Sequence, residues 1–173
     1  MATDNQKELM QVCVNELNEL YESIEQSMEH VRTKGLALLA GEIALVTFLF
    51  SPRGKGENLL SGDVPIYGFV IFGLGILLLF LAAGTFLYVL STVRWTRPPD
   101  EKDIADINKR FNSDPYEFLE YMKIGYTSAI NHCARMVTRR ANALMVGVYL
   151  FSFGILLVVL VKYCSNLITL GVK

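Results

Sequence analysis

The residues best suited to chemistry form a polar stripe just before the last hydrophobic run of the chain. On a helix, side chains at steps of +4, +7 or +8, and +11 share one face. The residues on this face are Asn131, Arg135, Thr138 or Arg139, and Asn142. Guanidinium groups bind phosphate oxygens in pairs, so the stripe predicts either a nucleotide or oligonucleotide site or an anion-selecting ring in a pore.

Further cations extend this predicted site. Arg94 and Arg97 follow the second hydrophobic run and are expected at the same height beside the membrane. The predicted phosphate-binding residues are Asn131, His132, Arg135, Arg139, Arg140, Arg94 and Arg97. The alternative is that arginines at a cytoplasmic membrane edge only set the topology and contact anionic lipid.

Glu42 is the only ionisable residue in the hydrophobic run 35–50. A charged group inside a membrane is costly and normally faces protein or water. We therefore expect Glu42, together with Thr138 and Asn142, to line a pore, or Glu42 to pair with a cation of another subunit. The alternative is that the run is short and that Glu42 lies closer to the membrane surface.

Catalytic machinery is not expected. The sequence has no GxSxG, Walker or HExxH motif, and none of its three cysteines forms a CxxC pair. We predict no catalytic residue, no metal site and no cofactor, and therefore a protein that is not an enzyme.

Charge segregation predicts the fold class. The chain is 52% hydrophobic and 19% charged, and its charges lie almost wholly in residues 1–34 and 94–140. A helix needs about 20 apolar residues to cross a bilayer. We expect an all-α membrane protein, an oligomeric bundle with three transmembrane helices and long cytoplasmic helical extensions. The predicted order is a cytoplasmic helix (1–34), a first span (35–50), an outer loop (51–63), a second span (64–93), a cytoplasmic helical region (94–140), a third span (141–162) and an outer tail (163–173).

Lysines and arginines near the span ends predict the orientation. Eight lie on the side of the N-terminus and of residues 94–140, and four lie on the other side. The N-terminus and residues 94–140 of this multi-pass membrane protein are therefore expected to be cytoplasmic.

Two long helices are expected to join the cytoplasmic part to the membrane part. Apolar residues recur at alternating steps of four and three, which predicts a coiled-coil seam packed on a neighbouring subunit or on the second cytoplasmic helix. The seam residues are Met10, Val14, Leu17, Tyr21, Ile24, Met28 and Val31. Asp114, Pro115 and Glu117 form a strong helix start, and no proline follows them. A single helix is therefore predicted from residue 115 through the third span.

This arrangement resembles the SLATT-type transmembrane effectors of bacterial nucleotide-signalling anti-phage systems, of the CBASS-like or Hailong-like kind. The residues that carry the resemblance are Tyr126, Ala129, Ile130 and Asn131, followed by Arg135, Arg139 and Arg140. The resemblance implies a pore-forming homo-oligomer, with a tetramer favoured, in the lipid bilayer of the inner membrane. It also implies a nucleotide or oligonucleotide ligand from a partner nucleotidyltransferase, which either opens the pore or holds it shut. Opening would depolarise the membrane and arrest growth.

Two other functions remain open. The chain could be a non-conducting membrane adaptor whose helical stalk recruits a cytosolic partner, or a small transporter subunit. The sequence has no visible inverted repeat of the kind that many transporters contain. Conduction by the purified protein would separate the pore from the adaptor.

Overall fold

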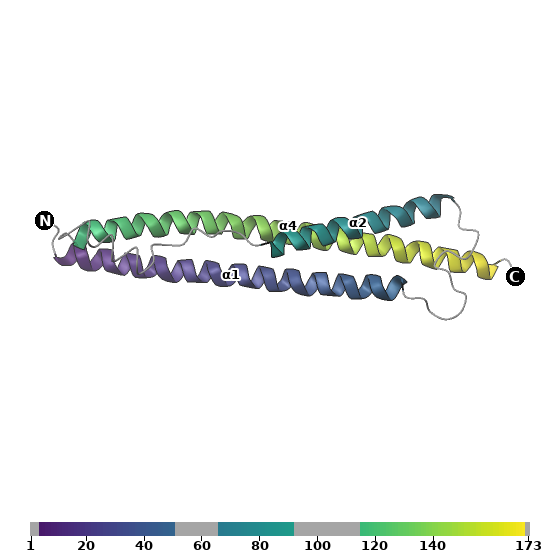
Figure 1. The fold of residues 1–173 in the computed structure, drawn as a ribbon, viewed down its shortest axis with the longest axis horizontal. Coiled ribbons are helices and arrows are strands. Elements are labelled where there is room, and N and C mark those ends of the chain that lie inside the picture. Colours follow the sequence, from purple (N-terminus) through teal and green to yellow (C-terminus); the bar gives the residue numbers. More distant parts are fainter. Residues whose placement is uncertain (1–3, 51–65, 92–114, 172–173) are drawn as a thin grey trace. The chain divides into compact units, whose positions relative to one another are not determined.

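The computed structural model describes residues 4–50, 66–91 and 115–171, all of which except Ser91 are helical. Helix α1 covers Asp4–Phe50, α2 covers Ile66–Leu90 and α4 covers Pro115–Gly171 (Figure 1). The expected outer loop (51–63) and the part of the expected cytoplasmic helical region that precedes residue 115 lie outside the described residues. The predicted all-α class is confirmed.

The two longest helices follow from the scarcity of helix breakers. The N-terminal helix was expected to continue into the hydrophobic run 35–50, and α1 does so without interruption over 47 residues. Helix α4 begins at Pro115, the predicted start, and runs for 57 residues. It continues beyond residue 162, through much of the expected tail, because no proline interrupts it and the next glycine is Gly171.

The chain divides into two units, and α1 and α4 contribute to both. The first unit comprises Met1–His30 and Thr92–Arg139, and the second comprises Val31–Ser91 and Arg140–Lys173. Each unit has its own packing.

The first unit is a pair of helices joined by the predicted heptad seam. On α1, Val14, Tyr21 and Met28 are buried at intervals of seven residues, and Met10, Leu17 and Ile24 are partly buried. The α4 residues packed in this core are Leu119, Met122, Tyr126, Ala129, Ile130 and Cys133. The partner of the seam, left open by the sequence, is therefore α4 of the same chain.

A side-chain hydrogen bond also joins the two helices of the first unit. The hydroxyl of Tyr126 donates a hydrogen bond of 3.1 Å to Oδ1 of Asn18. Burial, and secondarily the negative charge of Glu22, raises the pKa of the Tyr126 hydroxyl. This phenol therefore stays protonated and remains a donor at neutral pH.

The second unit packs α2 closely against α4. A Cβ atom placed on Gly75 would lie 3.1 Å from the carbonyl oxygen of Gly154 and 2.9 Å from Val158. Further along, Phe86 meets Gly147, and its ring lies 6.5 Å from that of Phe151. The two helices run antiparallel, because Gly75 near the start of α2 meets Gly154, whereas the later residue Phe86 meets the earlier residue Gly147. Small residues at these positions permit the close approach of the two helices.

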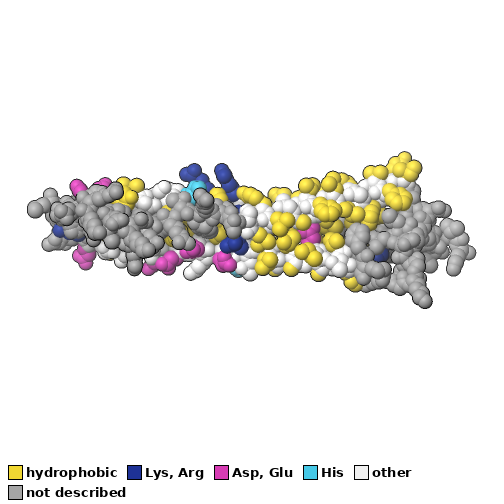
Figure 2. All heavy atoms as spheres, viewed as in Figure 1, with side chains coloured by type: hydrophobic (Ala, Val, Ile, Leu, Met, Phe, Trp, Pro, Cys, Tyr) yellow, Lys and Arg dark blue, Asp and Glu magenta, His cyan; other side chains and the backbone are white. Residues whose placement is uncertain are grey.

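Two helices are long and apolar enough to cross a membrane. These are Ile66–Leu90, with a mean hydropathy of 2.6, and the part of α4 within Tyr116–Lys162, with a mean hydropathy of 2.7. Only 17% and 22% of these apolar windows are buried within the chain, so most of their side chains face outward (Figure 2). The run 35–50 is not one of the two, and a third span stays a prediction.

Candidate functional site

The predicted polar stripe lies on the face of α4 that is turned away from α1. Asn131, His132, Arg135, Thr138 and Arg139 are all exposed, whereas Tyr126, Ala129, Ile130 and Cys133 are buried on the opposite face. The heptad seam determines this division, since burying the apolar face against α1 leaves the other face in solvent. Figure 2 shows lysine or arginine side chains projecting beside a histidine on the visible face.

Arg135 and Arg139 stand one helical turn apart on this exposed face. Residues four apart on a helix surface are neighbours, with Cβ atoms about 5–6 Å apart. The hydroxyl of Thr138 is engaged with its own helix, because it donates a hydrogen bond of 2.9 Å to the carbonyl oxygen of Ala134. Two guanidinium groups therefore form the cationic centre of the stripe, where they can bind phosphate oxygens.

Arg140 lies one residue further along α4 and has a different environment. It is only 3% exposed, and its Nη1 donates a hydrogen bond of 2.8 Å to the carbonyl oxygen of Val89. Its Nη2 donates to the carbonyl oxygen and the hydroxyl of Ser91. Phosphate binding by Arg140, as expected from the sequence, would require these hydrogen bonds to break.

The contacts of Arg140 complete the C-terminal end of α2. The last carbonyl groups of a helix lack partners within the helix and attract cations. The last turn of α2 contains no basic residue of its own, so Arg140 of α4 supplies the cation. This role could not be predicted from the sequence, because it depends on which residues of α4 lie beside the C-terminal end of α2.

The other predicted site residues are placed as follows. Arg94 and Arg97 lie outside the described residues, so their predicted position beside the stripe stays a prediction. Asn142 is exposed on α4. Neither Asn142 nor Thr138 lines the cavity that contains Glu42.

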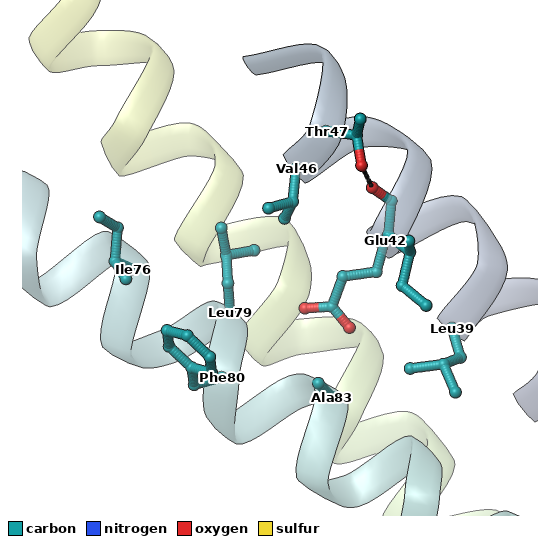
Figure 3. A pocket seen from close by; sticks show the side chains of 9 residues that line it. Leu39, Glu42, Val46, Thr47, Ile76, Leu79, Phe80 and Ala83 are labelled. Atoms are coloured by element: carbon teal, nitrogen blue, oxygen red, sulfur yellow. Dashed lines mark hydrogen bonds between the residues drawn. The ribbon is translucent and has the colours of Figure 1, made fainter. Parts of the chain in front are cut away.

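Glu42 occupies an apolar cavity between α1 and α2 in the second unit. The cavity has a volume of about 460 Å³. Its lining residues are Leu39, Glu42, Ile43, Val46, Thr47, Ile76, Leu79, Phe80 and Ala83. In Figure 3 the Glu42 side chain extends from α1 toward Leu79, Phe80 and Ala83 of α2.

The Glu42 carboxyl group is buried and incompletely satisfied. The residue is only 3% exposed, and its Oε2 has no hydrogen-bond partner within residues 4–50, 66–91 and 115–171. The nearby Thr47 hydroxyl is already engaged, because it donates a hydrogen bond of 2.7 Å to the carbonyl oxygen of Ile43 (Figure 3). A buried polar atom without a partner is unusual in proteins and calls for an explanation.

The described part of the chain contains no cluster of candidate metal ligands. No three histidine, cysteine, aspartate or glutamate side chains lie close enough together there to hold a metal ion. The described site groups are thus the two exposed arginines with their polar neighbours and the isolated Glu42 carboxyl group.

Comparison with known proteins adds no relative to this description. No protein-family model, curated protein or solved structure matches the chain.

Proposed function

We propose that this chain is a pore-forming effector of a bacterial inner membrane, in which several copies surround an ion path controlled by a phosphate-bearing nucleotide or oligonucleotide. The observation that carries the proposal is the position of Arg135 and Arg139. They lie exposed on α4 shortly before this helix becomes continuously apolar. A ligand held there contacts the helix that would enter the membrane.

The interior of the second unit supports a path between copies rather than through one chain. Phe86, Val89 and Val158 are fully buried, and Gly75 packs against the backbone of Gly154. An ion with its water cannot pass through such packing. The outward-facing apolar surfaces of α2 and α4 are available to lipid and to other copies.

The chemistry of the stripe supports a phosphate ligand. Guanidinium groups bind phosphate oxygens through paired hydrogen bonds, and Asn131 and His132 add polar groups next to Arg135. In a symmetric assembly the stripe is repeated in every copy, which increases the local positive charge. The same chemistry would also attract lipid phosphates, so an experiment must separate the two sources.

Ion flux from liposomes tests the pore. Purified full-length protein is reconstituted in vesicles of neutral phosphatidylcholine that are loaded with potassium chloride. We expect protein-dependent release of ions, and the double variant R135Q/R139Q is expected to respond at least about tenfold more weakly to the ligand, because each lost charged hydrogen bond costs about 1.5–3 kcal/mol. Lys123→Gln, which removes an exposed charge elsewhere on α4, is the control.

Adenosine triphosphate and a short oligoadenylate are the phosphate probes, and inorganic triphosphate tests recognition of phosphate alone. Repeating the assay with anionic phosphatidylglycerol shows whether headgroups replace the free ligand. Absence of ion release by the parent protein under all these conditions would contradict the pore and favour the adaptor. Equal probe binding by the parent and the double variant would contradict the ligand site.

A further inference from the structure

The cavity beside Glu42 combines two features of a ligand site. Its volume of about 460 Å³ is within the range of small-molecule pockets, which is roughly 300–1,000 Å³. Its walls are almost entirely hydrocarbon, apart from the carboxyl group of Glu42 and the hydroxyl of Thr47. Such pockets bind a mainly apolar molecule and fix its orientation through a few polar groups.

The cavity has an open side. Ile43 on α1 is 60% exposed and Phe80 on α2 is 73% exposed, although both line the cavity. These two side chains form its rim, whereas Glu42 and Leu79 lie buried inside. A molecule can therefore enter between α1 and α2 from the surroundings of the helices without unfolding the bundle.

The polar group inside the cavity selects a cation with hydrogen-bond donors. Oε2 of Glu42 is a buried acceptor with no described partner, and a carboxylate in apolar surroundings is strongly stabilised by a positive donor. The aromatic face of Phe80, drawn at the edge of the same cavity in Figure 3, also attracts cations.

The hydrophobic runs of the chain supply no cation to Glu42. The runs 64–93 and 141–161 contain no lysine or arginine, and the run 35–50 contains none either. The same runs of a second copy packed at this level would therefore also offer no lysine or arginine to Glu42. A bare metal ion also does not fit, because calcium requires about 6–8 oxygen ligands and the cavity provides one carboxyl and one hydroxyl group.

We propose that the cavity between α1 and α2 is a binding site for a hydrophobic amine. Its ammonium group bonds Oε2 of Glu42, and its hydrocarbon body fills the space lined by Leu79, Phe80 and Val46. The site is complete within one chain, so the proposal does not depend on whether the protein conducts ions or binds nucleotides.

Photolabelling tests the site directly. The probe is a long-chain alkylamine that carries a diazirine in its chain, and its neutral twin is the alcohol with the same chain. The full-length protein in detergent is labelled at neutral pH, and the modified peptides are identified by mass spectrometry. We expect the amine to label residues 36–48 of α1 and 76–83 of α2, and excess octylamine but not octanol to suppress this labelling.

Two variants sharpen the test. Glu42→Gln keeps the size of the side chain and removes its charge, and we expect it to lower labelling by the amine at least about tenfold, as loss of one charged hydrogen bond allows. Glu19→Gln makes the same replacement at an exposed position of α1 that does not line the cavity, and its labelling should match that of the parent.

The alcohol twin controls for folding. It should label the parent and Glu42→Gln to the same low extent, which shows that the cavity persists in the variant. Labelling of the parent by the alcohol as strong as by the amine would overturn the proposal, since the cavity would then be a lipid-filled groove. Unchanged labelling of Glu42→Gln by the amine would also overturn it. If the alcohol labels the parent and the variant to different extents, thermal unfolding with and without the amine tests binding instead. We then expect the amine to raise the Tm of the parent but not that of Glu42→Gln.

Discussion

Nη1 of Arg140 lies 2.8 Å from the carbonyl oxygen of Val89, so a cation on α4 completes the C-terminal end of α2. The same guanidinium group also donates to the carbonyl oxygen of Ser91. Arg139, its immediate neighbour, is exposed. Adjacent arginines in one sequence motif therefore have different environments, because a step of one residue turns a helix by 100°.

Replacement of Arg140 should destabilise the protein. Arg140→Met keeps most of the aliphatic volume but removes the donors to Val89 and Ser91, which leaves carbonyl groups at the end of α2 without their partner. Hydrogen bonds to charged groups contribute about 1.5–3 kcal/mol, and we expect a loss of this size in the free energy of unfolding. Thermal unfolding in detergent measures it.

Arg139→Met is the matched control for this replacement. Because Arg139 is exposed, its loss should change the free energy of unfolding by less than about 0.5 kcal/mol. Equal Tm values for the Arg140 and Arg139 variants would show that the hydrogen bonds from Arg140 to Val89 and Ser91 do not stabilise the protein.

The thiol of Cys133 should resist alkylation. Cys133 is 1% exposed in the core of the first unit, and burial, followed by the negative charge of Glu25, raises the pKa of this thiol above its ordinary value of 9.0. Since the thiolate is the reactive form, iodoacetamide should modify Cys133 at least about tenfold more slowly than the exposed Cys164. Peptide mass spectrometry of samples quenched at successive times gives both rates.

The raised pKa of Cys133 also predicts the sign of a pH effect on stability. The unfolded chain releases the thiol proton near pH 9, whereas the folded chain retains it to higher pH. The unfolded state then binds fewer protons, so the free energy of unfolding falls as pH rises above 9. The free energies of unfolding of the parent and of Cys133→Ala are compared across this pH range. If the advantage of the parent grew with pH, the predicted sign would be wrong.

Gly147 should not tolerate even a methyl group. A Cβ atom at this position would lie 2.6 Å from Cε1 of Phe86 and would also meet the Thr85 hydroxyl oxygen. Overpacking of this kind costs about 1–3 kcal/mol, and we expect Gly147→Ala to lower Tm accordingly. Gly73→Ala is the control, because a Cβ atom there has no neighbour within 4 Å. A similar Tm for the two variants would mean that α2 and α4 separate more easily than their packing suggests.

The sequence predicted the elements well because helix signals are local. Charge-free runs identified the two candidate spans, Pro115 marked the start of α4, and the heptad positions Val14, Tyr21 and Met28 are buried as the seam requires. These features depend on residues close together in the chain, so periodicity alone can reveal them.

Contacts between distant segments were less predictable. Glu42 was recognised as unusual from its type and position, yet the cavity that surrounds it depends on the register of α1 against α2. Similarly, Gly75, Gly147 and Gly154 meet a neighbouring helix, whereas Gly41, Gly73 and Gly84 have no such contact. Spacing along the sequence predicts which face of a helix a residue occupies. It does not predict which residue of the neighbouring helix packs against it.

The hydrogen bond between Arg140 and Val89 restricts the choice of amino acid at one of these positions more than at the other. Nη1 binds the main-chain oxygen of Val89, an atom that every amino acid possesses, so replacement at position 89 leaves the acceptor in place. At position 140, however, only a long side chain with forked donors can bridge the two carbonyl groups. Sequence variation should therefore be permitted at position 89 within the limits of volume, and strongly restricted at position 140.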